Sequence, residues 1–319
     1  MQDLKKIKTN SIIWPEGRRF AFSVFDDTDG TTMQNGPPVY EFLSDLGFRI
    51  TKSVWPIQVK TGRPSMGGTT CADPAYAGWV NRLQEQGFEI GLHSVTDTTA
   101  SREEWLAGLD KFYELFGHYP MIHANHTGCR DSIYWGDQRV SGVRRCAYNL
   151  LTKFRNRDFQ GHLPGTVGYW GDLCARHIKY VRNFVYADIN TLSECPYMPY
   201  HDPDRPFVRS WFASSEGPSV EAFNRTLSEI NQERLEIEGG ACIMYTHFAN
   251  GFYENGKLNS RFVSLMHRLS SRPGWFVPVS TLLDYLEAYR GHRYVITTSE
   301  RRRLERRWLM HKIRLGGTT

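Results

Sequence analysis

The sequence lacks any long apolar run. None of the stretches in its 319 residues approaches the roughly eighteen uninterrupted apolar residues of a membrane-spanning helix. Residues 1–10 are polar, and the lysines among them precede only the short apolar run of residues 12–14. That run is much shorter than the apolar core of a secretion signal. We therefore expect a cytoplasmic protein without a transmembrane segment.

Paired cysteines are missing as well. The six cysteines are scattered along the chain, and none of them forms a C-x-x-C pair. This spacing argues against a structural zinc knot and favours reduced, mostly buried thiols.

An excess of charge occurs in one place only. The net charge is +5, and residues 301–307 contain five arginines, so the rest of the chain is nearly neutral. No nucleic-acid recognition motif accompanies these arginines, which argues against a nucleic-acid partner. The basic segment indicates either a solvated terminal helix or a peripheral contact with an anionic membrane surface or a glycolipid phosphate.

A helical stretch that ends at a glycine and continues as a β-rich segment occurs three times in the first half of the chain. The expected helices and their glycines are residues 39–46 with Gly47, residues 75–86 with Gly87, and residues 101–116 with Gly117. The third helix begins with a capping box, Ser101-x-x-Glu104. Repeated units of helix, left-handed glycine cap and strand are typical of a parallel α/β sheet.

The remaining elements are less regular. Further strands are expected at residues 20–25, 180–186, 207–213, 241–246 and 275–279, and further helices at residues 219–236, 281–289 and 300–315. Residues 128–177 show no clear period, and we interpret them as an excursion over one face of the fold, with some helix near residues 141–154. We expect one domain, residues 1–290, followed by a basic helical extension, residues 291–319.

Carboxylates and imidazoles follow several expected strands. They are Asp26 and Asp27 after the first strand, His93 after the third, His123, Asn125 and His126 after the fourth, and His247 after residues 241–246. In parallel α/β folds the carboxyl ends of the strands meet at one rim, where sites gather. Carboxylate and imidazole are the usual ligands of zinc and its first-row neighbours, so we expect a divalent metal, zinc before manganese, iron, cobalt or nickel.

These residues resemble the polysaccharide deacetylase family, also called the NodB-homology family. Phe25-Asp26-Asp27-Thr28-Asp29-Gly30 is similar to its T-F-D-D-G strand end, Gly87 to Ser94 to its G-x-E-I-G-x-H-[ST] segment, and Ile243 to His247 to its final apolar-x-H strand. The match spans residues 19–289 in the family's order, and the combination is far more specific than any single piece.

The resemblance implies a distorted (β/α) barrel of seven or eight strands that hydrolyses an N-acetyl or O-acetyl group on a sugar. By this resemblance Asp26 is the general base, Asp27 and His93 bind the metal, and His247 is the general acid. The tract of residues 180–215 looks like a branch found in bacterial surface-polysaccharide and O-antigen gene clusters, which implies a carbohydrate substrate and leaves open whether it is lipid-linked.

Two positions depart from the family pattern. The family's second metal histidine lies four residues after the first, where this chain has Asp97. Asp97 is the expected third ligand and His126 its rival, in which case Asp97 would cap the helix near Ser101. The family's R-x-P-Y loop, whose arginine orients the base, is replaced by residues 123–126, and His123 is the candidate replacement partner for Asp26.

Several further residues are candidates for substrate binding or for orienting the base. They are His123, Asn125, Trp55, Tyr134 and Trp135. Aromatic side chains can stack on sugar rings, although they also fill cores. Two other functions stay open, namely a glycan-binding barrel that has lost catalysis and a hydrolase of another C–N bond such as a formamide.

Overall fold

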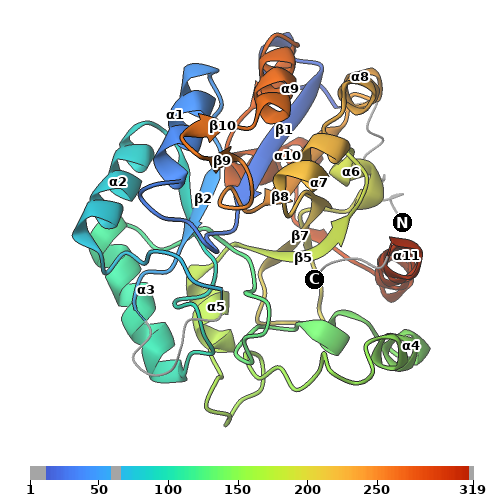
Figure 1. Cartoon of the computed structure of the whole chain (residues 1–319). Coiled ribbons are helices and arrows are strands. Elements are labelled where there is room, and N and C mark those ends of the chain that lie inside the picture. Colours follow the sequence, from blue (N-terminus) through green and yellow to red (C-terminus); the bar gives the residue numbers. More distant parts are fainter. Residues whose placement is uncertain (1–11, 59–65, 316–319) are drawn as a thin grey trace.

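The computed structural model describes residues 12–58 and 66–315. Seven parallel strands form a closed barrel that helices surround (Figure 1). In ring order they are β1 (Phe20–Asp26), β2 (Thr51–Val54), β3 (Glu89–Leu92), β4 (Ile122–His123), β5 (Tyr180–Tyr186), β7 (Ser210–Glu216) and β8 (Ala241–Thr246), which pairs again with β1. The predicted distorted (β/α) barrel is therefore confirmed.

The pairing around the ring is uneven. Strands β1 and β8 are in register over six residue pairs, from Ala21 with Ala241 to Asp26 with Thr246. Strands β3 and β4 share a single pair, Leu92 with His123. Strand β11 (Gly274–Phe276) lies outside the ring and pairs with the first half of β1. Strand β2 pairs with β1 only at the end of β1.

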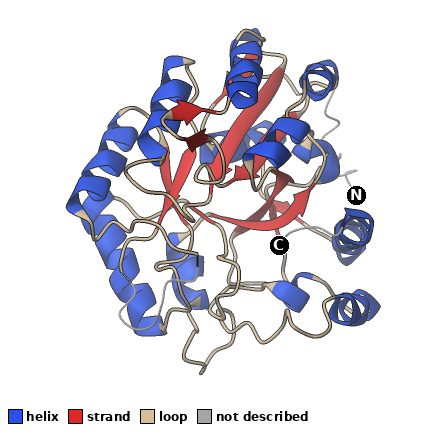
Figure 2. Cartoon of the chain, viewed as in Figure 1, coloured by secondary structure: helices blue, strands red, loops and turns tan. Residues whose placement is uncertain are grey.

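Helices connect the strands and cover the outside of the barrel (Figure 2). They are α1 (Gly36–Asp45), α2 (Pro74–Glu85), α3 (Arg102–Phe116), α4 (Val143–Leu151), α5 (Gly171–His177), α6 (Thr191–Glu194), α7 (Val220–Thr226), α8 (Glu229–Ile237), α9 (Ser260–Ser270), α10 (Val279–Arg290) and α11 (Thr298–Leu315), with short 3₁₀ turns at Pro15–Gly17 and Gly136–Arg139. Both halves of the Ser101–Glu104 capping box form at α3. The three predicted glycine turns have φ of +81°, +91° and +76° at Gly47, Gly87 and Gly117, values that glycine adopts without steric cost.

The single helix expected at residues 219–236 is wrong, because the chain breaks there into α7 and α8. The side-chain amide of Asn231 donates to the carbonyl of Thr226, and that of Gln232 donates to the carbonyl of Leu227. These amides satisfy carbonyls that the end of α7 leaves without a helical partner. The spacing of apolar residues in the sequence does not reveal a break of this kind between two helices.

The segment expected as an excursion, residues 128–177, lies in the connection between β4 and β5. Asp131 connects it to helix α3: its Oδ2 accepts a hydrogen bond from Trp105 Nε1 of α3 at 2.8 Å, and its carbonyl accepts one from Trp170 Nε1 at 2.7 Å. The two indoles stack, with ring centroids 3.5 Å apart. The excursion therefore has a rigid base beside the carboxyl end of β4.

The last part of the chain adds short strands and a helix. Strand β12 (Tyr294–Val295) pairs with β6 (Tyr200–His201), which lies antiparallel to β7, and β9 (Tyr253–Glu254) pairs with β10 (Lys257–Leu258) in a separate hairpin. Helix α11 packs against α4 and β5. The division into a domain, residues 1–290, and a basic helical extension, residues 291–319, stays a prediction. Among the described residues, no helix combines the length and apolarity needed to cross a membrane.

Candidate metal centre

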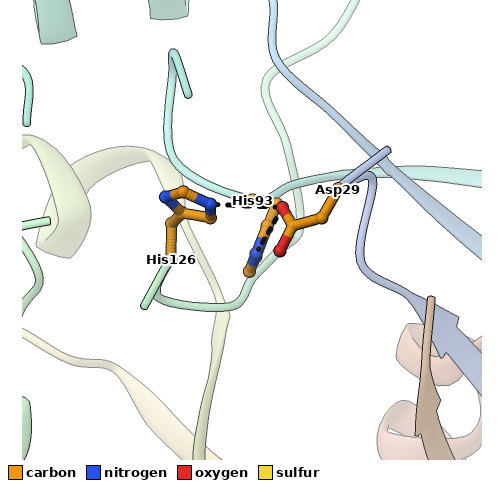
Figure 3. Close-up of side chains that lie close together, drawn as sticks. All are labelled: Asp29, His93 and His126. Atoms are coloured by element: carbon orange, nitrogen blue, oxygen red, sulfur yellow. Dashed lines mark ion pairs between the residues drawn. The ribbon is translucent and has the colours of Figure 1, made fainter. Parts of the chain in front are cut away.

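Three buried side chains converge at the carboxyl ends of the strands. Asp29 lies three residues beyond β1, His93 directly follows β3, and His126 lies three residues beyond β4. Asp29 Oδ1 is 3.4 Å from His93 Nε2 and 3.2 Å from His126 Nε2, and both imidazoles point at this carboxylate (Figure 3). One donor atom from each residue lies within 4.8 Å of the others, a spacing that could hold a metal ion.

The donor atoms of this cluster suit a divalent metal. His93 Nδ1 lies 3.1 Å from the carbonyl oxygen of Ala124 and His126 Nδ1 lies 3.0 Å from Cys129 Sγ, so each ring can donate through Nδ1 and present the lone pair of Nε2 to the cluster. Within the described chain, Asp29 Oδ1 and His126 Nε2 are buried and have no partner with hydrogen-bond geometry. Buried polar atoms without partners are costly, and a shared cation would satisfy both.

Electrostatics also favour a cation here. Burial alone would raise the pKa of Asp29, but the imidazoles of His93, His126 and His247 outweigh it and hold this pKa well below its usual range. Asp29 is therefore ionised at neutral pH and available as a ligand.

His247, the candidate general acid, lies beside the cluster on the β8 side. Its Nε2 is 3.3 Å from Asp29 Oδ2, and its Nδ1 is 3.0 Å from the carbonyl oxygen of Pro218. The side chain is slightly exposed. Nδ1 is the natural donor to Pro218, which turns Nε2 towards the cluster.

Asp27, expected as a metal ligand, lies next to the cluster and is bound by an arginine. Arg182, in the middle of β5, donates from Nη1 to Asp27 Oδ1 at 3.0 Å and from Nη2 to Oδ2 at 2.5 Å. His93 Nδ1 is 3.8 Å from Asp27 Oδ1, outside hydrogen-bond distance. The geometry therefore favours Asp29 over Asp27 as the carboxylate ligand, since the Asp27 oxygens are already paired.

Asp26, expected as the general base, lies away from the cluster. Its Oδ2 accepts from Tyr40 Oη at 2.7 Å and from Lys52 Nζ at 2.9 Å, and its Oδ1 accepts from the Phe248 N–H at 3.0 Å. Asp26 and Lys52 are both fully buried. Neighbouring side chains of an extended segment point to opposite sides, and here the arrangement favours Asp27 as the base and leaves Asp26 in a structural ion pair.

Asp97 lies at the edge of the cluster. Its two carboxylate oxygens accept hydrogen bonds from the backbone N–H groups of Met66 and Gly67, at 3.2 and 3.1 Å, and Oδ1 is 3.6 Å from His126 Nε2. Ser101 caps α3, so the alternative role of Asp97 as that helix cap is wrong. The contacts instead suit a residue that positions His126 and the segment after residue 65.

The residues that replace the family's arginine loop have structural partners. His123 Nε2 is 3.4 Å from Asn125 Oδ1, and burial, with a smaller contribution from His93, lowers the pKa of His123 to about 3. The side chain of Asn125 accepts a hydrogen bond from the Ile133 N–H at 2.8 Å and donates one to the Ile133 carbonyl at 3.1 Å. No hydrogen bond or ion pair from His123 to Asp26 occurs in the described chain, and Lys52 takes that place.

The candidate aromatic residues lie mostly inside the protein. Trp55 is buried and donates from Nε1 to the carbonyl of His93 at 2.6 Å, so it supports a ligand rather than facing solvent. Trp135 is buried against the guanidinium of Arg139, 3.8 Å from its ring centroid. Tyr134 borders a surface pocket, which has a volume of about 240 Å³ and is also lined by Arg145, Arg205 and Arg301.

Sequence reasoning missed Asp29 and Arg182. Asp29 stands within the quoted motif, two residues after Asp27, but was not assigned a role. Arg182 is a charged residue in the middle of a seven-residue strand that is buried throughout. A buried arginine requires a buried acid, so its position in the apolar run was the available signal.

Comparison with known proteins agrees with this architecture. No protein-family model and no curated protein matches the sequence. A solved structure of a proposed polysaccharide deacetylase from Mycobacterium smegmatis is similar, with a TM-score of 0.51 and 12% identity over 90% of this chain and 96% of that one. The Puue allantoinase (TM-score 0.49, 12% identity, 90% and 97% coverage) and a polysaccharide deacetylase candidate from Pseudomonas aeruginosa PAO1 (0.47, 12%, 86% and 93%) also align. The chain therefore has the barrel fold of the polysaccharide deacetylases.

Proposed function

We propose that this protein is a metal-dependent hydrolase that removes an acetyl group from an N-acetylated or O-acetylated sugar of a surface polysaccharide or its precursor. The observation that carries the proposal is the convergence of Asp29, His93 and His126 on one point, with Asp27 near His93 and His247 near Asp29. The deacetylase barrel fold and the resemblance of the sequence motifs support the same reaction. A cytoplasmic location and a lipid-linked substrate stay predictions.

Asp29, His93 and His126 would hold the metal, with zinc the first candidate and manganese, iron, cobalt and nickel the alternatives. A bound ion of this kind lowers the pKa of a coordinated water and polarises a carbonyl oxygen. Two imidazoles and one carboxylate leave coordination positions open for water and substrate, as catalytic sites require.

Asp27 would take the proton from the attacking water. Its carboxylate lies on the β1 side of the cluster, and the two-point ion pair with Arg182 fixes its orientation and stabilises its negative charge. Arg182 is a positioning residue, because it acts through Asp27.

His247 would protonate the departing sugar amine or alcohol. The carbonyl of Pro218 orients its ring through Nδ1, and Nε2 lies near Asp29 Oδ2, whereas His93 and His126 lie near Oδ1. An amine is a poor leaving group without this proton, so the acid matters most for an acetamide substrate.

The test measures acetate released from a panel of N-acetylated and O-acetylated sugars by protein that has been stripped with a chelator and reloaded with zinc. We expect acetate only after reloading, and none from Asp29→Asn. Asp110→Asn, an exposed aspartate on α3, is the matched control and should retain activity.

Two outcomes would contradict the proposal. Glycan binding without acetate release under any of the five metals would indicate a barrel that has lost catalysis. Release of formate rather than acetate from matched N-formyl and N-acetyl sugars would indicate hydrolysis of a different C–N bond.

A further inference from the structure

Helix α4 presents its apolar side chains to solvent. Val143 is 79% exposed, Leu150 67% and Leu151 53%, and Phe154, just after the helix, is 49% exposed. Cys146 lies on the same side and is exposed. Spacings of three, four and seven residues place this set on one helix face, which amphipathic surface helices normally turn towards the core.

The side of α4 that faces the protein carries the buried Tyr148, with Arg144 and Arg145 beside it. Arg144 Nε donates to Glu305 Oε2 at 2.7 Å, and Arg145 Nε donates to Asp137 Oδ2 at 2.7 Å. Both acids are almost fully buried. Rotating the helix to hide its apolar face would break both ion pairs and bring the buried side chain of Tyr148 to the surface, which is unfavourable. The outward apolar face is therefore fixed by the fold.

The surroundings of the apolar face are basic. Residues 138–157 contain six arginines and lysines and no acidic residue, although Arg139 is buried and Arg144 and Arg145 pair with buried acids. Lys153, Arg155 and Arg157 are exposed at the end of α4. Helix α11, which packs beside α4 at the lower right of Figure 1, adds exposed Arg302 and Arg306.

We propose that α4 is a membrane-docking surface that lies in the headgroup region of an anionic lipid bilayer. An exposed apolar face flanked by lysine and arginine is the pattern of helices that rest in the plane of a membrane surface. Basic residues near an anionic surface add electrostatic attraction to the burial of apolar side chains. This inference goes beyond the proposed reaction and does not depend on it.

A second copy of the chain fits the surface less well. A two-fold dimer brings the same patch of both copies together. The exposed cations around α4 would then face one another, and like charges across an interface are unfavourable. The same cations favour anionic lipid, so charge decides between the two occupants.

The experiment measures flotation of the full chain with vesicles of phosphatidylcholine, with or without one quarter phosphatidylglycerol. An environment-sensitive fluorophore on Cys146 reports insertion, since the other five cysteines are buried. The test variant is Leu150→Glu with Leu151→Glu, at exposed positions. The matched control is Ile230→Glu with Ile237→Glu, two isoleucines on α8 that are 77% and 76% exposed.

We expect binding to the anionic vesicles with a blue shift of the fluorophore, weakening at high salt, and about tenfold or more weaker binding of the α4 variant, because apolar burial and lipid charge act together. Lys153→Glu with Arg155→Glu should also weaken binding, while the α8 control should bind as the parent does. No binding to anionic vesicles, or equal losses in the α4 and α8 variants, would overturn the proposal. So would a dimer in solution that the α4 variant separates.

Discussion

Arg182 and Asp27 form a two-point ion pair across the barrel, between the middle of β5 and the end of β1. These strands are not neighbours in the ring. The guanidinium also lies over the ring of Tyr245, 4.5 Å from its centroid, so its plane is held from a second direction. Paired hydrogen bonds of this kind fix the orientation of a carboxylate as well as its charge.

Replacing Arg182 should therefore reduce turnover without removing the metal. We expect Arg182→Gln to lower kcat by about a hundredfold, with little change in KM, because the base loses its orientation. Arg182→Lys should recover only part of this loss, since lysine supplies charge without the two-point geometry. Steady-state kinetics and metal analysis provide the measurement, and an unchanged kcat would remove Arg182 as a positioning residue.

Substitutions can distinguish the proposed metal ligands from the residues beside them. Asp29→Asn and His126→Ala should each abolish stoichiometric zinc, whereas Asp97→Asn should weaken zinc affinity by about tenfold to a hundredfold, as expected for a residue that supports a ligand. Calorimetric titration of stripped protein with zinc gives all three values. Loss of the metal from Asp97→Asn, with retention in Asp29→Asn, would reverse the assignment.

The loss of activity on replacing His247 should depend on the leaving group of the substrate. His247→Ala should retain its metal and lose about a hundredfold to ten-thousandfold of its activity on a sugar acetamide. An activated ester, whose alcohol departs without help, should lose far less. The test measures the rates on both substrates in the same preparation of His247→Ala. Equal losses of rate on the acetamide and the ester would exclude His247 as the general acid.

Asp26 and Lys52 should support stability rather than catalysis. Removing one member leaves the other charge buried without a partner, so Asp26→Ala or Lys52→Met should each lower the free energy of unfolding by about 3 to 5 kcal/mol. The double variant Asp26→Leu with Lys52→Met should recover much of that loss. Urea unfolding of the three variants tests this, and a stable but inactive Asp26→Ala would restore Asp26 as the base.

His162 should make the protein sensitive to mild acid. Its Nδ1 accepts a hydrogen bond from the Tyr134 N–H at 3.3 Å, and burial, assisted by Arg205 and Arg145, lowers its pKa from 6.5 to about 4. The unfolded chain therefore binds the proton first, so this contribution to stability is present above pH 6.5 and is lost as the pH falls towards 4.

The expected size of the His162 effect is at most about 3 kcal/mol, since each unit of pKa shift corresponds to about 1.4 kcal/mol. Urea unfolding at pH 7.5 and 4.5 should show a larger drop for the parent protein than for His162→Gln, which does not titrate. An equal loss of unfolding free energy in the parent protein and in His162→Gln would show that His162 does not cause the acid sensitivity.

Local signals in the sequence predicted the barrel well. The glycine turns at Gly47, Gly87 and Gly117 and the capping box at Ser101 each depend on a few adjacent residues, and the structure has all of them. Strands 180–186 and 241–246 have the predicted bounds. Residues 241–245 form a continuous apolar run, as buried parallel strands usually do.

Roles within the site were harder to predict, because they depend on the direction of each side chain. Asp26, Asp27 and Asp29 stand within four residues, yet one meets Lys52, one meets Arg182 and one meets the histidines. Both cations come from strands distant in the sequence. No local pattern could assign these partners, although the strand ends correctly predicted which segments would meet.

The single residue pair between β3 and β4 has a consequence for the loaded protein. This is the shortest stretch of pairing in the ring, and His93 and His126 follow the two strands that it joins. A metal held by both histidines would link β3 to β4, the neighbouring strands of the ring that share the fewest residue pairs. A metal that binds only when β3 and β4 are paired stabilises the closed barrel by mass action. Metal binding and the pairing of these two strands are therefore thermodynamically linked.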